Sequence, residues 1–452
     1  MTLSRRTLLK GASALPLLAA NLPLPAFAQA AAGVSEIPPI LFVHGNGDHA
    51  ALWITTLWRM ESNGIARDRM FAINFTDPLA RNDDAVAQPN RSSTEDQRRE
   101  LGDAIKALKQ RTGAARVALV GNSRGGNAIR NYVKNGGSAD VSHAVLCGTP
   151  NHGVFAWDEN LGNEFNGRGP FLRGLNDGDS EVTPGTAFLT LRSDGLDKYA
   201  QPDGRFVGKP GTPTNVTTEG PALKGATNLV LGPVDHRETA YHPRAFREIF
   251  KFIAGREPER LEIVAETEVR LSGLVTGTPG GVQTNRPVPD AMVEVFRVAP
   301  GTGERIGNAI HTSKTAADGR WGPASVDPSW PLEIVLTSPG STTTHFYRSP
   351  FPRSSDIVHL RAARPLTPAD TGAIVMMSRP RGYFGLPRDV VLLDGKEPAD
   401  VKPGVPTDSL TTLKLPPEDA GRAVAALFNE ERIVARAWPT AENSIAVVEL
   451  TY

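Results

Sequence analysis

The chain has 452 residues, a formal net charge of zero and a hydrophobic fraction of 40%. This length is sufficient for two or three ordinary domains. The balanced charge argues against nucleic acid as a partner, because phosphate binding relies on a basic face. The only cysteine, Cys147, excludes an intramolecular disulfide. It belongs to the apolar run 144–147, which predicts a buried strand residue rather than a catalytic thiol.

The N-terminal residues have the features of a targeting segment. Residues 4–10 contain an arginine pair, an apolar stretch follows, and residues 26–28 (Ala-Phe-Ala) form a small-x-small cleavage site. We therefore predict a twin-arginine signal peptide over residues 1–28, with the twin-arginine export machinery as a partner and a periplasmic or extracellular destination. The alternative is a membrane anchor, which Pro16 and the prolines after it disfavour.

Residues 33–255 alternate between strand and helix signals. Apolar runs predict strands at 39–43, 70–75, 117–121, 143–147, 188–192 and 228–231, and helical spacing predicts helices at 95–110, 125–133 and 243–253. Strands separated by helices indicate βαβ units, so the predicted fold class is α/β, with a doubly wound, mostly parallel sheet.

Residues 151–184 interrupt this alternation. The segment is rich in glycine and asparagine and contains several aromatic residues. Long insertions in compact domains are usually functional, and we expect a lid or cap over the site. The alternative is a packed surface excursion.

The composition changes near Gly255. Beyond it, short apolar runs split by proline and glycine are typical of antiparallel β structure. We predict a β-sandwich domain over 263–363 and a second β-rich C-terminal domain over 366–452, with a boundary near 364–368.

The clearest chemical signal is the sequence Gly-Asn-Ser-Arg-Gly at residues 121–125. It matches G-x-S-x-G, follows a predicted strand and precedes a predicted helix, which is the context of a nucleophile elbow. Small glycines permit the sharp turn that exposes the hydroxyl of Ser123. Ser123 is the predicted nucleophile.

A serine nucleophile needs a base and an acid that orients it. His236 follows the last predicted strand, where this fold places its base, and is preferred over His242, which adjoins the closing helix. The acid is expected in the loop after residue 192, where Asp197 is preferred and Asp194 is the alternative. Asp235 is disfavoured because neighbouring side chains usually point apart.

The oxyanion of the reaction needs backbone donors. We expect the amide of Arg124, directly after the nucleophile, and the amide of Asn46, in the loop that follows the first strand. His49 and its neighbours 52–53 line a pocket or contribute only packing. No metal-ligand spacing and no phosphate-binding or dinucleotide motif is present, so neither a metal nor another cofactor is predicted.

These motifs resemble those of bacterial triacylglycerol lipases. The resemblance covers residues 39–254 and includes 44–47, 121–126 and the His236 loop. Gly-Thr-Pro-Asn-His-Gly at 148–153 is especially similar to the small lidless bacillary lipases. It implies an α/β-hydrolase fold and ester hydrolysis.

The second half resembles that of the archaeal lipase with a C-terminal β-barrel domain, through Phe-Tyr-Arg-Ser-Pro-Phe at 346–351. In that relative the C-terminal domain supports hydrolysis of long-chain lipids, and the catalytic aspartate directly follows the strand equivalent to 143–147. This chain has Gly148 and Thr149 there. The departure supports an acid later in the chain.

The function predicted is therefore an exported serine lipase or esterase that forms an acyl-enzyme. An ester or lipid substrate is the expected partner, with transient contact to a lipid interface. A polyester depolymerase and a catalytically relict protein that binds a surface or polymer are the alternatives. A chain ending near Gly255 is expected to keep the triad and lose long-chain activity, if the aromatics at 346–351 extend an acyl groove rather than fill a β core.

Overall fold

A computed structural model describes residues 37–452, which form one compact unit. The predicted signal peptide at 1–28 lies outside the described residues. Within 37–452, none of the helices is long and apolar enough to cross a bilayer.

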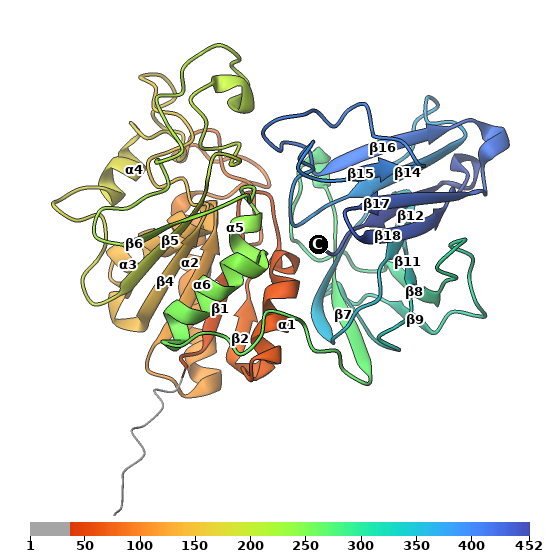
Figure 1. The fold of residues 1–452 in the computed structure, drawn as a ribbon, viewed down its shortest axis with the longest axis horizontal. Coiled ribbons are helices and arrows are strands. Elements are labelled where there is room, and N and C mark those ends of the chain that lie inside the picture. Colours follow the sequence, from red (N-terminus) through yellow and green to blue (C-terminus); the bar gives the residue numbers. More distant parts are fainter. Residues whose placement is uncertain (1–36) are drawn as a thin grey trace, which may run out of the picture. The chain divides into compact units, whose positions relative to one another are not determined.

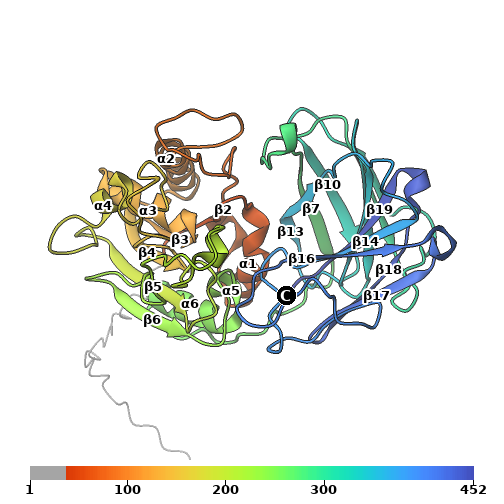
Figure 2. The same ribbon diagram turned by 90° about the horizontal axis from the view of Figure 1, so that it is seen from above.

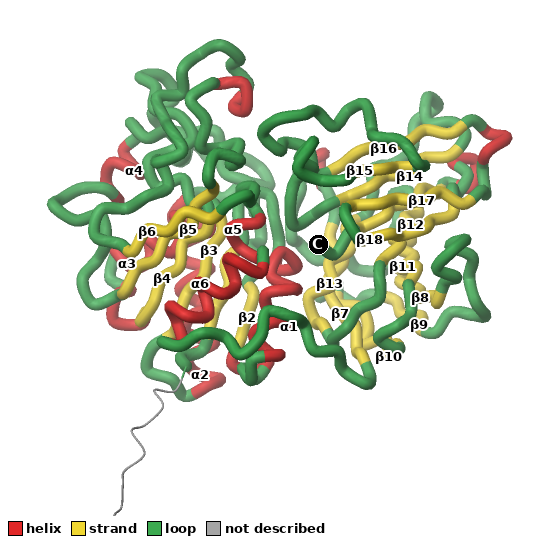
Figure 3. The backbone as a smooth tube through the Cα atoms, viewed as in Figure 1, coloured by secondary structure: helices red, strands yellow, loops and turns green. Residues whose placement is uncertain are grey.

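The first part of the chain contains a six-stranded, fully parallel sheet in the order β2-β1-β3-β4-β5-β6 (Figures 1 and 3). Its strands are β1 (Ile40–Val43), β2 (Met70–Ala72), β3 (Val117–Asn122), β4 (Val141–Cys147), β5 (Ala187–Ser193) and β6 (Thr227–Leu231). The helices are α1 (Ile54–Ser62), α2 (Thr94–Thr112), α3 (Arg124–Lys134), α4 (Pro170–Leu175), α5 (Glu238–Tyr241) and α6 (Pro243–Ala254). The predicted fold class, an α/β-hydrolase sheet followed by β structure, is confirmed.

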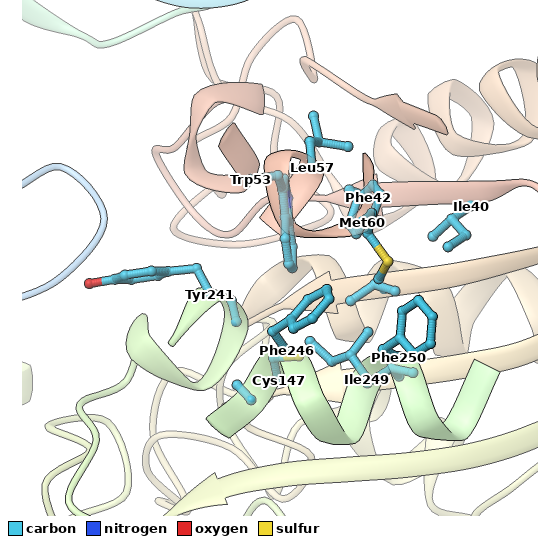
Figure 4. Packing of buried hydrophobic residues seen from close by; sticks show 14 of the residues in the cluster. Ile40, Phe42, Trp53, Leu57, Met60, Cys147, Tyr241, Phe246, Ile249 and Phe250 are labelled. Carbon is cyan, nitrogen blue, oxygen red and sulfur yellow. The ribbon is translucent and has the colours of Figure 1, made fainter. Parts of the chain in front are cut away.

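Helices cover both faces of this sheet because successive strand residues point to opposite sides. In β1, Phe42 packs with Trp53 and with Phe246 of α6 in one core, as Figure 4 shows. Leu41 belongs to a second core, which includes Leu101 of α2. Cys147 is fully buried in the first core, as predicted.

The second part of the chain is built from strands only, apart from short turns. Its strands are β7 (Val269–Thr276), β8 (Met292–Arg297), β9 (His311–Lys314), β10 (Arg320–Val326), β11 (Leu332–Thr337), β12 (Thr343–Arg348), β13 (Ser355–Arg361), β14 (Ala373–Ser378), β15 (Val391–Leu393), β16 (Leu410–Leu415), β17 (Ala423–Phe428), β18 (Glu431–Arg436) and β19 (Ser444–Glu449). They form a seven-stranded sheet, β16-β14-β19-β12-β11-β8-β9, and two three-stranded sheets, β10-β7-β13 and β15-β17-β18 (Figures 1 and 2).

The seven-stranded sheet contains strands from both sides of the boundary predicted near 364–368. β19 pairs in parallel with β12, so that His345 lies opposite Ala446. The segments 263–363 and 366–452 therefore share one sheet, and the division into two β domains stays a prediction. Pairing between strands about 100 residues apart leaves no local trace in the sequence.

Candidate active site

Ser123 occupies the sharp turn between β3 and α3. Its backbone has φ 54° and ψ −124°, a conformation that L-residues rarely adopt. The flanking glycines leave room for this turn: a Cβ at Gly121 would lie 2.6 Å from Ile129 Cδ1, and one at Gly125 would lie 2.5 Å from the carbonyl oxygen of Val43. The turn holds the Ser123 side chain at the positive end of α3.

His236 and Asp197 meet beside this turn although they come from different loops. His236 Nδ1 lies 2.8 Å from Asp197 Oδ2, and the two side chains are 3% and 4% exposed. The other carboxylate oxygen of Asp197 accepts the backbone N–H of Tyr199 at 2.8 Å. The ring of Tyr199 contacts the His236 ring edge-on, with centroids 4.7 Å apart. Hydrogen bonding and packing therefore fix the orientation of the imidazole.

The competing residues have other surroundings. Asp194 is exposed. His242 caps α6, where its Nδ1 accepts the backbone N–H of Arg244 at 3.2 Å. Asp235 turns away from its neighbour His236 and pairs with Arg379 at 3.0 Å. Of the aspartates considered, Asp197 is the one that contacts His236. His242 lies at the start of α6 instead of beside Asp197.

Gly148, directly after β4, lies against the loop of His236, which leaves no room for a side chain at this position. Its φ of 55° favours glycine, and a Cβ at this position would lie 2.8 Å from the backbone oxygen of His236. A side chain here would displace the His236 loop.

Ser123 and His236 both line one pocket of about 260 Å³. The loop after β1 contributes Asn46, the segment 151–184 contributes Val154, Phe155 and Phe165, and a further apolar edge comes from Phe206 and Val207. The pocket therefore has a polar end with the proposed reacting groups and an apolar wall. Of the residues 49, 52 and 53, none lines this pocket, and Leu52 and Trp53 belong to the core.

The loop that carries Asn46 is held by a buried histidine. His44 Nε2 accepts the backbone N–H of Phe75 at 3.1 Å, so Nδ1 carries the proton and donates to the Gly45 oxygen at 2.9 Å. Burial lowers the pKa of His44 to about 4, which keeps the ring neutral. The side chain of Asn46 accepts the N–H of Ala80 at 2.8 Å, and Asn46 lines the pocket.

The side chain of Arg124 anchors the segment 151–184. Its guanidinium binds Glu164 through two hydrogen bonds of 2.7 and 2.6 Å, and the side chains are 0% and 2% exposed. It also donates to Ser92 Oγ at 2.9 Å. The segment that walls the pocket is therefore tied to the residue that directly follows Ser123. Its role as a lid or cap stays a prediction.

The β part of the chain reaches this site through residues that the sequence did not single out. Tyr383 lines the pocket, and Arg379 and Arg388 bind the acidic residues beside His236. Of the aromatics at 346–351, Tyr347 and Phe351 are buried in β cores, and none lines the pocket of Ser123. One sequence signal could have indicated these partners: the charged run 235–238, because its carboxylates need cationic partners if the loop is buried.

Among residues 37–452, no group of three or more potential ligands could hold a metal ion.

Two family models match the chain. Residues 38–152, which include Ser123, match lipase (class 2), and residues 267–365 match the lipase C-terminal domain. No curated protein matches the chain at a significant level.

Several solved structures are similar to the chain. Aspergillus fumigatus lipase B is 16% identical over 51% of this chain and 56% of that chain, with a TM-score of 0.37. Bacillus licheniformis lipase BlEst2 in mature form is 19% identical over 48% of this chain and 91% of that chain, with a TM-score of 0.34. Phospholipase PlaB from Legionella pneumophila is 14% identical over 72% of this chain and 94% of that chain, with a TM-score of 0.32. These identities and scores are low, and each family model matches about a quarter of the chain.

Proposed function

We propose that this chain, an α/β-hydrolase of the lipase type with a lipase C-terminal domain, hydrolyses carboxylic esters of lipids through an acyl-enzyme on Ser123. The observation that carries the proposal is the buried Asp197–His236 pair, whose histidine lines the same pocket as Ser123. A serine without such a base is a weak nucleophile.

In the proposed mechanism, Ser123 Oγ attacks the ester carbonyl while His236 Nε2 accepts its proton. Asp197 holds the Nδ1–H and stabilises the imidazolium. The amides of Arg124 and Asn46 donate to the oxyanion. His236 then protonates the departing alcohol, and a water molecule activated by the same histidine releases the acid from Ser123.

The apolar wall of the pocket favours an acyl chain as the group that lies beside Ser123. Phe155 stacks on Trp157 with ring centroids 4.4 Å apart, and Val154 belongs to the same cluster. Each methylene that this wall removes from water contributes about 0.8 kcal/mol to binding. Hydrolysis of a polyester is the second candidate, because its chain also presents an ester between apolar units. Export by the twin-arginine route is part of the proposal and is supported by residues 4–10 and 26–28.

The experiment compares the wild type with Ser123→Ala on a series of esters from acetate to palmitate, together with labelling by a fluorophosphonate. We expect labelling at Ser123, and a loss of activity by several powers of ten in a folded Ser123→Ala protein. A wild-type protein that neither hydrolyses any ester nor reacts with the probe would favour a relict binding protein. A polyester film assayed in parallel separates the two substrate classes.

A further inference from the structure

The loop that carries His236 is held from outside the α/β part by Arg379, which directly follows β14. Arg379 Nη1 donates to Asp235 Oδ2 at 3.0 Å, and Nη2 donates to Glu238 Oε1 at 2.5 Å and to the hydroxyl of Tyr241 at 3.0 Å. One guanidinium therefore binds Asp235, which precedes His236, and also Glu238 and Tyr241, which follow it.

These contacts bear directly on the backbone around His236. Asp235 Oδ1 accepts the N–H groups of Arg237 and Glu238 at 2.8 and 2.9 Å, so its carboxylate closes the turn that contains His236. Glu238 Oε2 accepts the N–H of Asp235 at 2.6 Å. The turn is thus closed by two carboxylates, and Arg379 binds both of them.

The pairing is buried, and the two carboxylates share Arg379 with a second arginine, Arg388. The side chains of Arg379, Asp235 and Glu238 are 4%, 0% and 7% exposed. Burial alone would raise the pKa of Glu238, but Arg379 and Arg388 outweigh it and lower the pKa. Without Arg379, two buried carboxylates would share Arg388 as their remaining close cation, and the turn would rearrange to reach water or another donor.

The same part of the chain also holds the loop of the acid. Lys198, next to Asp197, donates to the backbone oxygen of Thr407 at 2.8 Å, and its Nζ lies 3.9 Å from the ring centroid of Tyr383. The backbone N–H of Tyr383 donates to Asp235 at 2.8 Å. Both loops of the Asp197–His236 pair therefore rest on residues from the C-terminal β part.

We propose that Arg379 is a positioning residue of the reaction: it fixes the turn of His236 against the C-terminal β part and so keeps the imidazole aligned between Asp197 and Ser123. This inference rests on the proposed function. It assigns to the C-terminal part a role in the chemical step itself, for esters of every chain length.

The test uses the full chain and a short, water-soluble ester such as a butyrate. Arg379→Met is compared with Arg379→Lys and with Arg422→Met, the control. Arg422 pairs with Asp394 at 2.6 Å in the same β part, and both side chains are about one-third exposed. We expect Arg379→Met to lower kcat by about 10- to 100-fold, the order of effect of a small misplacement of a catalytic group. KM should change by less than about twofold, since Arg379 lies outside the pocket lining.

A fluorophosphonate provides the second readout, because its reaction with Ser123 depends on His236 as the base. Labelling of Arg379→Met should slow by the same factor as kcat, Arg379→Lys should recover part of the rate, and Arg422→Met should match the wild type. If Arg379→Met does not fold, Glu238→Gln, which keeps the size of the side chain and removes its charge, decides the question by the same two rates.

A folded Arg379→Met or Glu238→Gln protein with wild-type kcat and labelling rate would overturn the inference while leaving the proposed function intact. An inactive, unlabelled wild type would instead overturn the proposed function. Loss of activity in proportion to loss of folded protein, with a normal rate per folded molecule, would also overturn the positioning role.

Discussion

Asp197 approaches His236 within 2.8 Å in a buried setting, whereas Asp194, three residues earlier on the same loop, is exposed. Asp197→Asn should therefore lower kcat on a soluble ester by about 10⁴-fold, because the amide favours the wrong imidazole tautomer and cannot stabilise the imidazolium. Asp194→Asn is the matched control and should retain nearly full activity. The reverse order in steady-state kinetics of the two folded variants would show that the acid is Asp194.

The buried pair of Arg124 and Glu164 leads to a prediction about stability. Glu164→Gln leaves a buried guanidinium without its counter-ion, and the loss of one partner of a buried pair costs about 3–5 kcal/mol. We expect a lower melting temperature and faster limited proteolysis within 151–184. Asp158→Asn, which breaks an exposed pair with Arg168 on the same segment, is the control and should change neither. Equal proteolysis of the two variants would mean that Glu164 does not anchor the segment.

Much of the site could be predicted from the sequence because its signals are local. The turn of Ser123 needs glycines two residues before and two residues after it. The apolar runs of the parallel strands are continuous because both faces of the sheet are covered. The acid could be narrowed only to Asp194 and Asp197. Which of two aspartates in one loop points inward depends on the path of that loop, and the sequence does not contain this path.

The remaining features depend on partners that are distant in the chain. β19 is a short apolar run like any other, and nothing within it indicates that it pairs with β12. Arg379 and Glu164 read as surface residues because charged side chains are almost never buried unless paired. Their partners lie 144 and 40 residues away in sequence, for Arg379 with Asp235 and for Glu164 with Arg124.

His44 predicts a dependence of stability on pH. Burial lowers its pKa from 6.5 to about 4, so the folded state binds fewer protons than the unfolded state between these values. The contribution of His44 to the free energy of unfolding is therefore fully present above pH 6.5 and is lost as the pH falls through 4. The difference of about 2.5 units corresponds to at most about 3 kcal/mol.

Urea unfolding of the wild type and His44→Gln at several pH values between 4 and 7 measures this contribution. The variant should be less stable at pH 7 and should show a shallower loss of stability on acidification. Burial also lowers the pKa values of His49 and His359. Both residues are present in the wild type and in the variant, so they contribute equally to the pH dependence of stability in the two proteins. His311→Gln is the comparison: burial also lowers the pKa of this ring, but the ring is only partly buried, so we expect a smaller change in the pH dependence than for His44→Gln. Parallel curves for the wild type and His44→Gln would show that His44 is not held neutral in the fold.

The final prediction concerns a chain that ends at Gly255. The sequence suggests that it would keep short-chain activity, but the structure leads to a different expectation. Ile54 and Trp58 of α1 belong to the core of the β part, where Trp58 Nε1 donates to the Ser354 oxygen at 2.9 Å. Truncation exposes both side chains and leaves Asp235 and Glu238 without Arg379 and Arg388.

We therefore expect the shortened chain to aggregate or to unfold without cooperativity, and any soluble fraction to be impaired on butyrate as strongly as on palmitate esters. Size-exclusion chromatography, urea unfolding and the two specificity constants measure this. Trp58→Ala in the full chain is the milder version and should cost about 3–5 kcal/mol of stability. A monodisperse, cooperatively unfolding fragment with wild-type turnover of butyrate would contradict the expectation. Such a result would show that the loop of His236 works without Arg379. The C-terminal part would then act only in the hydrolysis of esters with long acyl chains.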